Sequence, residues 1–175
     1  MQTGLLLLRI VVGVIVVGHG LQKLFGWFSG PGLSGAGAFF ETLGHRPGRP
    51  LALIAAVSEI TGGLLIVVGL LTPLGAAIVF GTLFVAAVST FKNGFWNVNG
   101  GGEYPLVLGL VGLVIAFTGP GRYSVDDALG LELSGLQWGA SAAVLALAAS
   151  VPPLLRMRAA RRAIATADAD RTAAV

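Results

Sequence analysis

The chain has 175 residues, of which 55% are hydrophobic and 11% are charged, and its mean hydropathy is +0.86. Soluble domains are roughly 45–50% apolar and about 25% charged, so this composition excludes an ordinary soluble domain and indicates an integral membrane protein. The net charge of +3 does not indicate nucleic-acid binding, because the arginines cluster after an apolar run instead of covering a basic face. The absence of cysteine excludes disulfides, thiolate metal sites, iron–sulfur clusters and covalent haem.

Five apolar segments follow one another with short breaks. A bilayer core of about 30 Å needs roughly 20 apolar residues in a helix. The segments nearest that length are Gly4–Phe25, Pro50–Leu71, Leu74–Phe91, Glu103–Thr118 and Gln137–Leu155. We therefore predict an all-α membrane bundle with a retained first helix, since no basic n-region precedes that segment and no small-residue cleavage site follows it. Residues 1–133 would form the core, residues 134–156 an additional helix, and residues 157–175 a basic, disordered tail.

The breaks between these segments differ in character. The first loop, Gly26–Gly48, is rich in glycine and contains Ser34–Leu43, a run that predicts a short helix at the membrane interface. Thr72-Pro73 forces a tight hairpin between the second and third helices. The third loop, Lys92–Gly102, is polar, glycine-rich and aromatic, and the fourth, Gly119–Gly135, contains a capped turn of helix.

Lysines and arginines near the helix ends predict the orientation. Lys23 ends the first helix, and further cations of the first loop, the third loop and the tail would lie on the same side: Arg46, Arg49, Lys92, Arg156, Arg158, Arg161 and Arg162. The opposite side shows only Arg122 outside the helices. Because cytoplasmic loops carry the excess of Lys and Arg, we predict a multi-pass protein of the bacterial inner membrane with a cytoplasmic C-terminus.

The first helix carries three cationic or titratable side chains on one face. At 100° per residue, His19 lies at about 280° and Lys23 at about 320° relative to Arg9, so the three share an arc of about 80°. Ionisable residues at membrane depth are costly and therefore mark candidate functional sites.

Glu59 lies about 13 Å along the second helix. Its neighbours on the same face are small: Ala55, Ala56, Gly62 and Gly63. Small residues allow another helix to approach, so Glu59 is expected inside the bundle. We predict that it pairs with His19, with Lys23 or Arg9 as further partners. The alternative is a buried ionic network that only holds the helices in register.

The third loop is expected at the same membrane face as these charges, which predicts a polar cavity with an aromatic rim. The predicted ligand-binding residues are Arg9, His19, Lys23, Glu59, Trp96, Asn97 and Glu103. Glu103 alone is equally well explained as the first residue of a helix whose dipole it stabilises. His45 is interpreted as an ordinary loop residue, and no residue pattern predicts a metal site.

Several motifs resemble the DoxX family of small bacterial inner-membrane proteins. They are Leu5–Arg9 followed by His19–Gly26, Phe39–Glu41, Glu59, Asn93–Asn97 with Glu103–Pro105, and Thr118–Ser124. The resemblance covers roughly residues 4–130 and implies a four-helix membrane core. It also implies an association with redox systems, since the family includes proteins similar to the DoxD subunit of thiosulfate:quinone oxidoreductase. The added segment Gln137–Leu155 and the arginine-rich tail depart from that pattern.

Three functions compete at this point. The first is a quinone-interacting or accessory membrane subunit of an oxidoreductase, with non-covalently bound quinone, a partner subunit or soluble reductase, and Glu59, His19 or Glu103 exchanging protons. The second is a carrier of small solutes or lipids that works as a homo-oligomer. The third is a structural or stress-related membrane component whose ion pairs only stabilise the bundle.

Overall fold

A computed structural model describes residues 1–173 and shows α-helices without strands across that range. The helices are α1 (Gln2–Phe25), α2 (Gly32–Thr42), α3 (Gly48–Val68), α4 (Thr72–Thr90), α5 (Glu103–Thr118), α6 (Val125–Ala128) and α7 (Leu136–Ala173). Two 3-10 turns, η1 (Phe91–Asn93) and η2 (Asn97–Asn99), lie in the third loop. The predicted all-α membrane bundle is confirmed.

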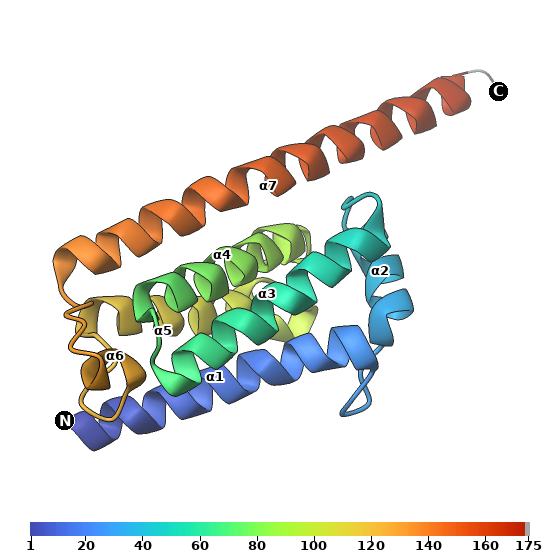
Figure 1. Cartoon of the computed structure of the whole chain (residues 1–175). Coiled ribbons are helices and arrows are strands. Elements are labelled where there is room, and N and C mark those ends of the chain that lie inside the picture. Colours follow the sequence, from blue (N-terminus) through green and yellow to red (C-terminus); the bar gives the residue numbers. More distant parts are fainter. Residues whose placement is uncertain (174–175) are drawn as a thin grey trace.

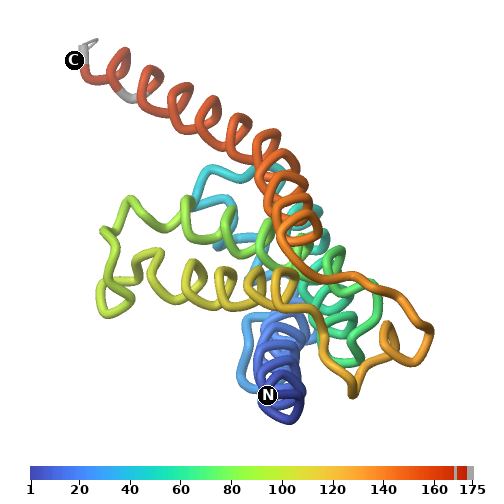
Figure 2. Tube along the Cα trace, turned by 90° about the vertical axis from the view of Figure 1, so that its left-hand side faces the viewer, coloured from blue at the N-terminus to red at the C-terminus, as the bar shows by residue number. Residues whose placement is uncertain are grey.

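The long helices run side by side, and the short ones cover the ends of the bundle (Figures 1 and 2). α3 packs against α1, α2 and α4, while α4 also packs against α5 and α7. α2 lies at one end together with the projecting part of α7, and α6 lies at the other end beside the N-terminus (Figure 1). The two termini of the described chain therefore lie at opposite ends of the bundle.

Glycines make the contact between α1 and α3 close. A Cβ atom on Gly13 would lie 2.6 Å from the carbonyl oxygen of Gly63, and one on Gly20 would lie 2.7 Å from that of Ala56. Side chains at these positions would force the helices apart, because real Cβ atoms do not approach carbonyl oxygens so closely. The small residues around Glu59 thus allow another helix to approach, as the sequence predicted, and they bring α1 within reach of that carboxylate.

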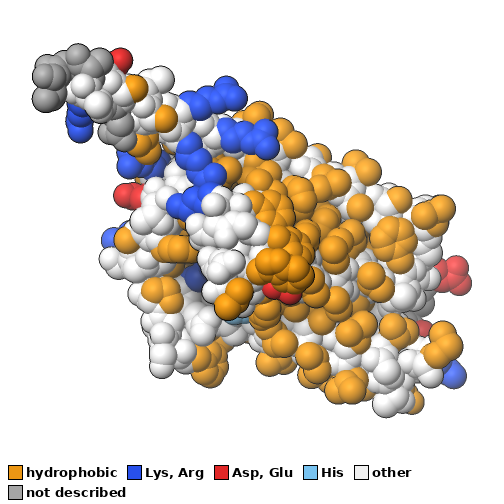
Figure 3. Space-filling view, turned by 180° about the vertical axis from the view of Figure 1, so that it is seen from behind, with side chains coloured by type: hydrophobic (Ala, Val, Ile, Leu, Met, Phe, Trp, Pro, Cys, Tyr) orange, Lys and Arg blue, Asp and Glu red, His pale blue; other side chains and the backbone are white. Residues whose placement is uncertain are grey.

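Within residues 1–173, four helices are long and apolar enough to cross a membrane: Gln2–Phe25, Gly48–Val68, Thr72–Asn93 and Leu136–Thr172. α5 is apolar but shorter, with 16 residues. At 1.5 Å per residue it spans about 24 Å, somewhat less than a bilayer core. Hydrophobic side chains cover most of one side of the bundle, and Lys and Arg gather where α7 projects (Figure 3).

Exposed aromatic side chains mark the two interfaces. Trp27 and Trp96 lie in the first and third loops, whereas Tyr123 and Trp138 lie near the opposite end, and all four are exposed by 36% or more. Tryptophan and tyrosine favour the membrane–water interface. From Trp138 to Arg156, α7 rises about 27 Å, which matches the thickness of a hydrocarbon core.

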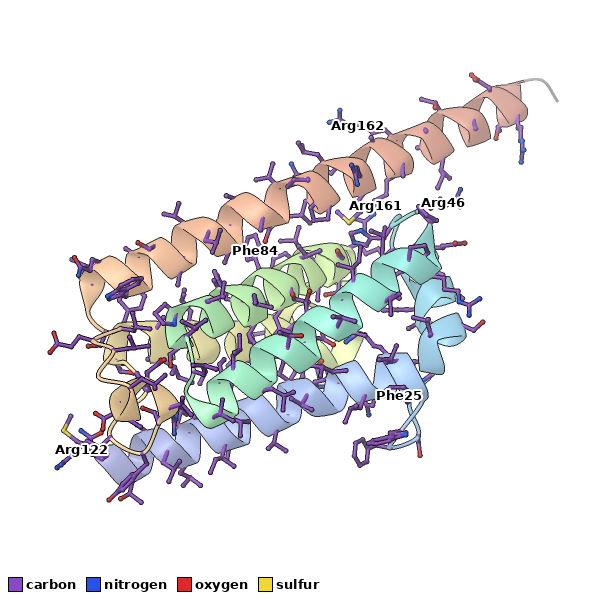
Figure 4. All side chains as sticks on the ribbon, viewed as in Figure 1. Phe25, Arg46, Phe84, Arg122, Arg161 and Arg162 are labelled. Atoms are coloured by element: carbon purple, nitrogen blue, oxygen red, sulfur yellow. The ribbon has the colours of Figure 1, made fainter. Side chains whose placement is uncertain are left out.

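The arginines at the two ends of the bundle agree with these two interfaces. Arg46, Arg161 and Arg162 lie at one end of the bundle and Arg122 at the other (Figure 4). This is the grouping that the sequence predicted. The cytoplasmic location of the arginine-rich end, and hence of the C-terminus, stays a prediction.

The expected end of the last helix at Leu155 is wrong. α7 continues through Pro152 and Pro153 to Ala173 without a break, where a disordered tail from residue 157 was expected. The extension has a physical basis, since alanine and arginine favour helix and Met157 is only 2% exposed against the bundle. Residues 174–175 of that tail lie outside the described residues.

The fourth loop folds over the turn between α3 and α4. Ser124 caps α6 by accepting a hydrogen bond from the Asp127 backbone N–H at 3.2 Å, as the sequence predicted. Asp126, two residues after Ser124, is fully buried and accepts hydrogen bonds from the backbone N–H groups of Leu71 and Thr72 and from the Thr72 hydroxyl, at 2.7, 3.0 and 2.7 Å. Its carboxylate thus caps the N-terminus of α4.

Candidate functional site

A cavity of about 830 Å³ lies inside the bundle and draws on α1, α2, α3, α4, α5 and α7. Along α4 its lining runs from Ala77 to Thr90, a rise of about 20 Å. Most of the lining is apolar and includes Phe39, Phe40, Leu51, Ile54, Ile78 and Val85. The cavity is therefore long and mainly hydrophobic.

The cavity reaches the surface at several places, one of which is between α3 and α7. Ile54 on α3 lines the cavity and is also 61% exposed, and Ala149 on α7 is both a lining residue and exposed. These residues belong to the segments that are apolar enough to span the bilayer. The opening therefore faces the hydrocarbon layer of the membrane.

Lys23 and Glu59 form an ion pair in the cavity wall. The Lys23 Nζ donates to Glu59 Oε1 at 2.7 Å and to Oε2 at 2.6 Å, and the Glu59 side chain is 2% exposed against 23% for Lys23. Glu59 faces the interior and pairs with Lys23, which was predicted as a further partner, whereas the first-choice pairing with His19 is wrong. The long lysine side chain crosses from α1 to α3, whereas the shorter imidazole is engaged elsewhere.

His19 bonds to Tyr104 and Gln22. The Nδ1 atom of His19 lies 3.1 Å from Gln22 Oε1, and Nε2 lies 3.0 Å from the Tyr104 hydroxyl oxygen. The Gln22 amide nitrogen donates to the Phe28 carbonyl at 3.5 Å, so its oxygen accepts from His19 Nδ1–H. In neutral His19, Nε2 then accepts the hydroxyl proton of Tyr104. The pair presents a phenol and an imidazole to the cavity.

His45 forms a further polar part of the wall, contrary to its interpretation as an ordinary loop residue. It is 5% exposed, and its Nε2 atom lies 2.7 Å from Ser89 Oγ. Ser89 donates its only hydroxyl proton to the Val85 carbonyl at 2.6 Å, so His45 Nε2–H donates to Ser89. Burial, followed by the nearby charge of Arg161, lowers the pKa of His45 below its ordinary value.

This lowered pKa predicts acid sensitivity. The unfolded chain takes up a proton at His45 below about pH 6.5, whereas the folded protein resists it until the lowered pKa is reached. The contribution of neutral His45 to stability is therefore complete above about pH 6.5 and is lost as the pH falls. We expect the thermal midpoint in detergent to fall on acidification to about pH 5.5, and His45→Gln, which keeps a donor for Ser89, to reduce that fall. Identical pH profiles for the two proteins would contradict the assignment.

Arg161 fastens α7 to the same region. Its Nε donates to the Leu43 carbonyl at 2.8 Å and its Nη2 donates to the Ser89 carbonyl at 2.9 Å. These carbonyls lie at the C-terminal ends of α2 and α4, where a cation is favourable. In Figure 4, Arg161 points toward the bundle and the neighbouring Arg162 points away.

We expect Arg161→Ala to lower the free energy of unfolding by about 2 kcal/mol, because two charged hydrogen bonds to buried carbonyls are lost. Arg162→Ala is the matched control, since it removes the same charge from the same turn, and it should change stability by less than about 0.5 kcal/mol. Denaturant unfolding in detergent measures both. Equal effects of the two variants would contradict the anchoring role of Arg161.

Four of the predicted ligand-binding residues do not line the cavity. Arg9 is 1% exposed and donates to the Tyr123 carbonyl, and Nε and Nη1 of its guanidinium have no hydrogen-bond partner among the described residues. It shares a helix face with His19 but lies ten residues away, about 15 Å along the axis. The prediction used the angle of Arg9 around the helix axis and did not include its position along that axis.

The third loop turns outward instead of forming a rim. Trp96 is 61% exposed, and the Asn97 backbone N–H donates to Glu103 Oε2 at 2.9 Å. The Glu103 carboxylate therefore holds the third loop against the start of α5, and it lies in the first turn of that helix, where the dipole favours a negative charge. Its neighbours Tyr104 and Pro105 line the cavity. The sequence placed both in a motif of the family resemblance but did not predict them as ligand-binding residues.

Comparison with known proteins gives a consistent set of relatives. A family model described as DoxX matches residues 4–92. The chain is similar to "Inner membrane protein YphA" of Escherichia coli (strain K12), with 30% identity over 131 residues, 70% of this chain and 87% of that protein. It is also similar to "Putative oxidoreductase CatD" of Bacillus subtilis (strain 168), with 31% identity over 125 residues, 71% of this chain and 86% of that protein. No solved structure matches the chain.

Proposed function

Because the chain belongs to the DoxX family of membrane proteins, we propose that its cavity binds a lipophilic quinone and that it serves an oxidoreductase as an accessory membrane subunit. The name of the relative from Bacillus subtilis supports a redox connection. The partner would be an oxidoreductase subunit or a soluble reductase that supplies the electrons.

The observation that carries the proposal is the arrangement of polar side chains in an otherwise apolar cavity. The pairs Lys23–Glu59 and His19–Tyr104 both include a residue of α1, and His19 and Lys23 are four residues apart on one helix face. A quinone ring carries two carbonyl oxygens that accept hydrogen bonds. Lys23 retains a third N–H for one of these oxygens, and a bound quinone would accept the Tyr104 hydroxyl proton at the other in place of His19 Nε2.

The apolar part of the cavity fits the isoprenoid tail of a quinone. Its length of about 20 Å along α4, its apolar lining and its opening toward the hydrocarbon layer fit an isoprenoid chain. A network that only held the helices in register would pair its charges and leave no space beside them. The volume of about 830 Å³ next to the paired charges therefore favours a binding role over a purely structural one.

The test compares the chain's two tyrosines. Tyr104 lines the cavity, whereas Tyr123 is 60% exposed near the other end of the bundle and contributes its carbonyl, not its hydroxyl, to Arg9. We expect Tyr104→Phe to weaken binding of decylubiquinone about 5- to 10-fold, the effect of one lost hydrogen bond. Tyr123→Phe should leave binding unchanged, and both variants should unfold at the wild-type temperature.

Equilibrium binding in detergent and extraction of endogenous quinone from the purified protein are the measurements. Saturable binding that weakens only in Tyr104→Phe would support the proposal. Absence of saturable binding to the wild-type protein, or equal weakening in the two variants, would overturn it. A carrier of other lipids would instead retain a different lipid in the extract.

A further inference from the structure

The cavity contains one of the chain's two lysines. The sequence has nine arginines and two lysines, Lys23 and Lys92. Lys92 is exposed in the third loop and donates to the Thr42 carbonyl at 3.1 Å. Lys23 lines the apolar cavity and holds both oxygens of Glu59. Two amines of the same protein thus occupy contrasting environments.

Arginine would be the stronger partner for a buried carboxylate. Its planar guanidinium matches both carboxylate oxygens at once, and it stays charged, whereas a lysine amine can lose its proton and act as a nucleophile. This chain uses arginine for its other buried cationic contacts, at Arg9 and Arg161. The lysine at this position therefore offers a chemistry that pairing alone does not require.

We infer that Lys23 forms an imine with lipophilic aldehydes that enter the cavity from the bilayer, with Glu59 as the proton acceptor and donor. The ligand class is a long-chain aldehyde, whose carbonyl would reach Lys23 while its chain occupies the apolar length of the cavity. The inference goes beyond quinone binding and does not require it.

The steps balance without an oxidant or a reductant. Lys23 Nζ passes a proton to Glu59 Oε2 across 2.6 Å, and the neutral amine attacks the carbonyl carbon to form a C–N bond. A second proton moves from nitrogen to the former carbonyl oxygen, which gives a carbinolamine. Glu59 returns its proton to the hydroxyl group as the C–O bond breaks and water leaves. The products are a protonated imine, a carboxylate and one water molecule.

The surroundings of Lys23 favour the protonated imine. The iminium cation takes the place of the ammonium beside Glu59, so no buried charge loses its partner. Glu59 is 2% exposed, Lys23 is 23% exposed and the cavity lining is mainly apolar, so water reaches an imine at Lys23 less readily than one at the exposed Lys92. Lys92 has neither an acid–base partner among the described carboxylates nor protection from solvent.

The experiment uses the full chain in detergent with dodecanal and sodium cyanoborohydride, which reduces the imine to a stable amine that peptide mass spectrometry locates. We expect labelling of Lys23 at least tenfold faster than that of Lys92, and saturating with dodecanal concentration. Propanal, which has no chain to bury, should label Lys23 no faster than Lys92. Lys23→Arg keeps a charge pair with Glu59 and should lose the fast labelling. Glu59→Gln keeps the amine and should slow the labelling at least tenfold.

Equal labelling of Lys23 and Lys92 by dodecanal, or no labelling of Lys23, would overturn the inference. So would fast labelling that persists in Glu59→Gln. Absence of fast Lys23 labelling together with intact decylubiquinone binding would reject imine formation and leave the quinone proposal unaffected. Fast labelling of Lys23 without quinone binding would reject only the proposal that the cavity binds a quinone.

Discussion

Replacing Lys23 by alanine should lower the free energy of unfolding by about 3–5 kcal/mol, because it leaves the carboxylate of Glu59 buried without its cation. Glu59 is 2% exposed and receives both of its hydrogen bonds from Lys23. The variant must either keep an uncompensated charge in an apolar cavity or protonate the carboxyl group, and both cost free energy.

Denaturant unfolding in detergent measures the effect, and Lys92→Ala is the control, since it removes the chain's other lysine from an exposed loop. That control should change stability by less than about 0.5 kcal/mol. The double variant Lys23→Met with Glu59→Leu should recover most of the loss, because hydrophobic side chains of similar volume replace the whole pair. A double variant no more stable than Lys23→Ala would show that the ion pair itself specifies the packing of α1 on α3.

Asp126→Ala should cost about 3 kcal/mol, since three hydrogen bonds to the start of α4 are lost and the two backbone N–H groups remain buried. Arg9 would lose its nearest favourable charge at the same time, because Asp126 is the carboxylate that interacts with its guanidinium. Both losses act on the end of the bundle where α1, the α3–α4 turn and α6 meet (Figure 1).

Asp127→Ala is the matched control for this prediction. Asp127 is the next residue and is exposed, and it takes part in the caps of α6 through its backbone groups. Its replacement should change the free energy of unfolding by less than about 0.5 kcal/mol. If the two alanine variants unfold alike, Asp126 does not hold the α3–α4 turn as its contacts indicate.

The apolar helices could be predicted from the sequence because the bilayer imposes a length and a composition on each. The starts of α3 and α4 and both ends of α5 lie within two residues of the predicted segments. The end of α7 could not be predicted in this way, because Pro152 and Pro153 usually terminate helices and the tail beyond them is polar. Its helix depends on tertiary contacts at Met157 and Arg161.

The candidate site was predicted less completely, for a geometric reason. Periodicity gives the angle of a residue around its helix, and this placed Glu59 and Lys23 inside the bundle together. It does not give relative depth or side-chain direction, so Arg9 was grouped with His19 and Lys23, about 15 and 21 Å away along the helix, and His19 was assigned the wrong partner. His45 and Asp126 depend on contacts between residues 44 to 55 positions apart, which local patterns do not contain.

The side opening between α3 and α7 is formed by two stretches of the chain, of which only one lies within the family match. The ion pair and the His45–Ser89 contact lie within residues 4–92, the part that the family model matches, whereas one side of the opening is formed by α7, which lies beyond it. The paired charges and the α7 side of the opening are thus encoded in separate stretches of the chain. Substitutions in α7 can therefore change the width of this opening while Lys23 and Glu59 stay in place.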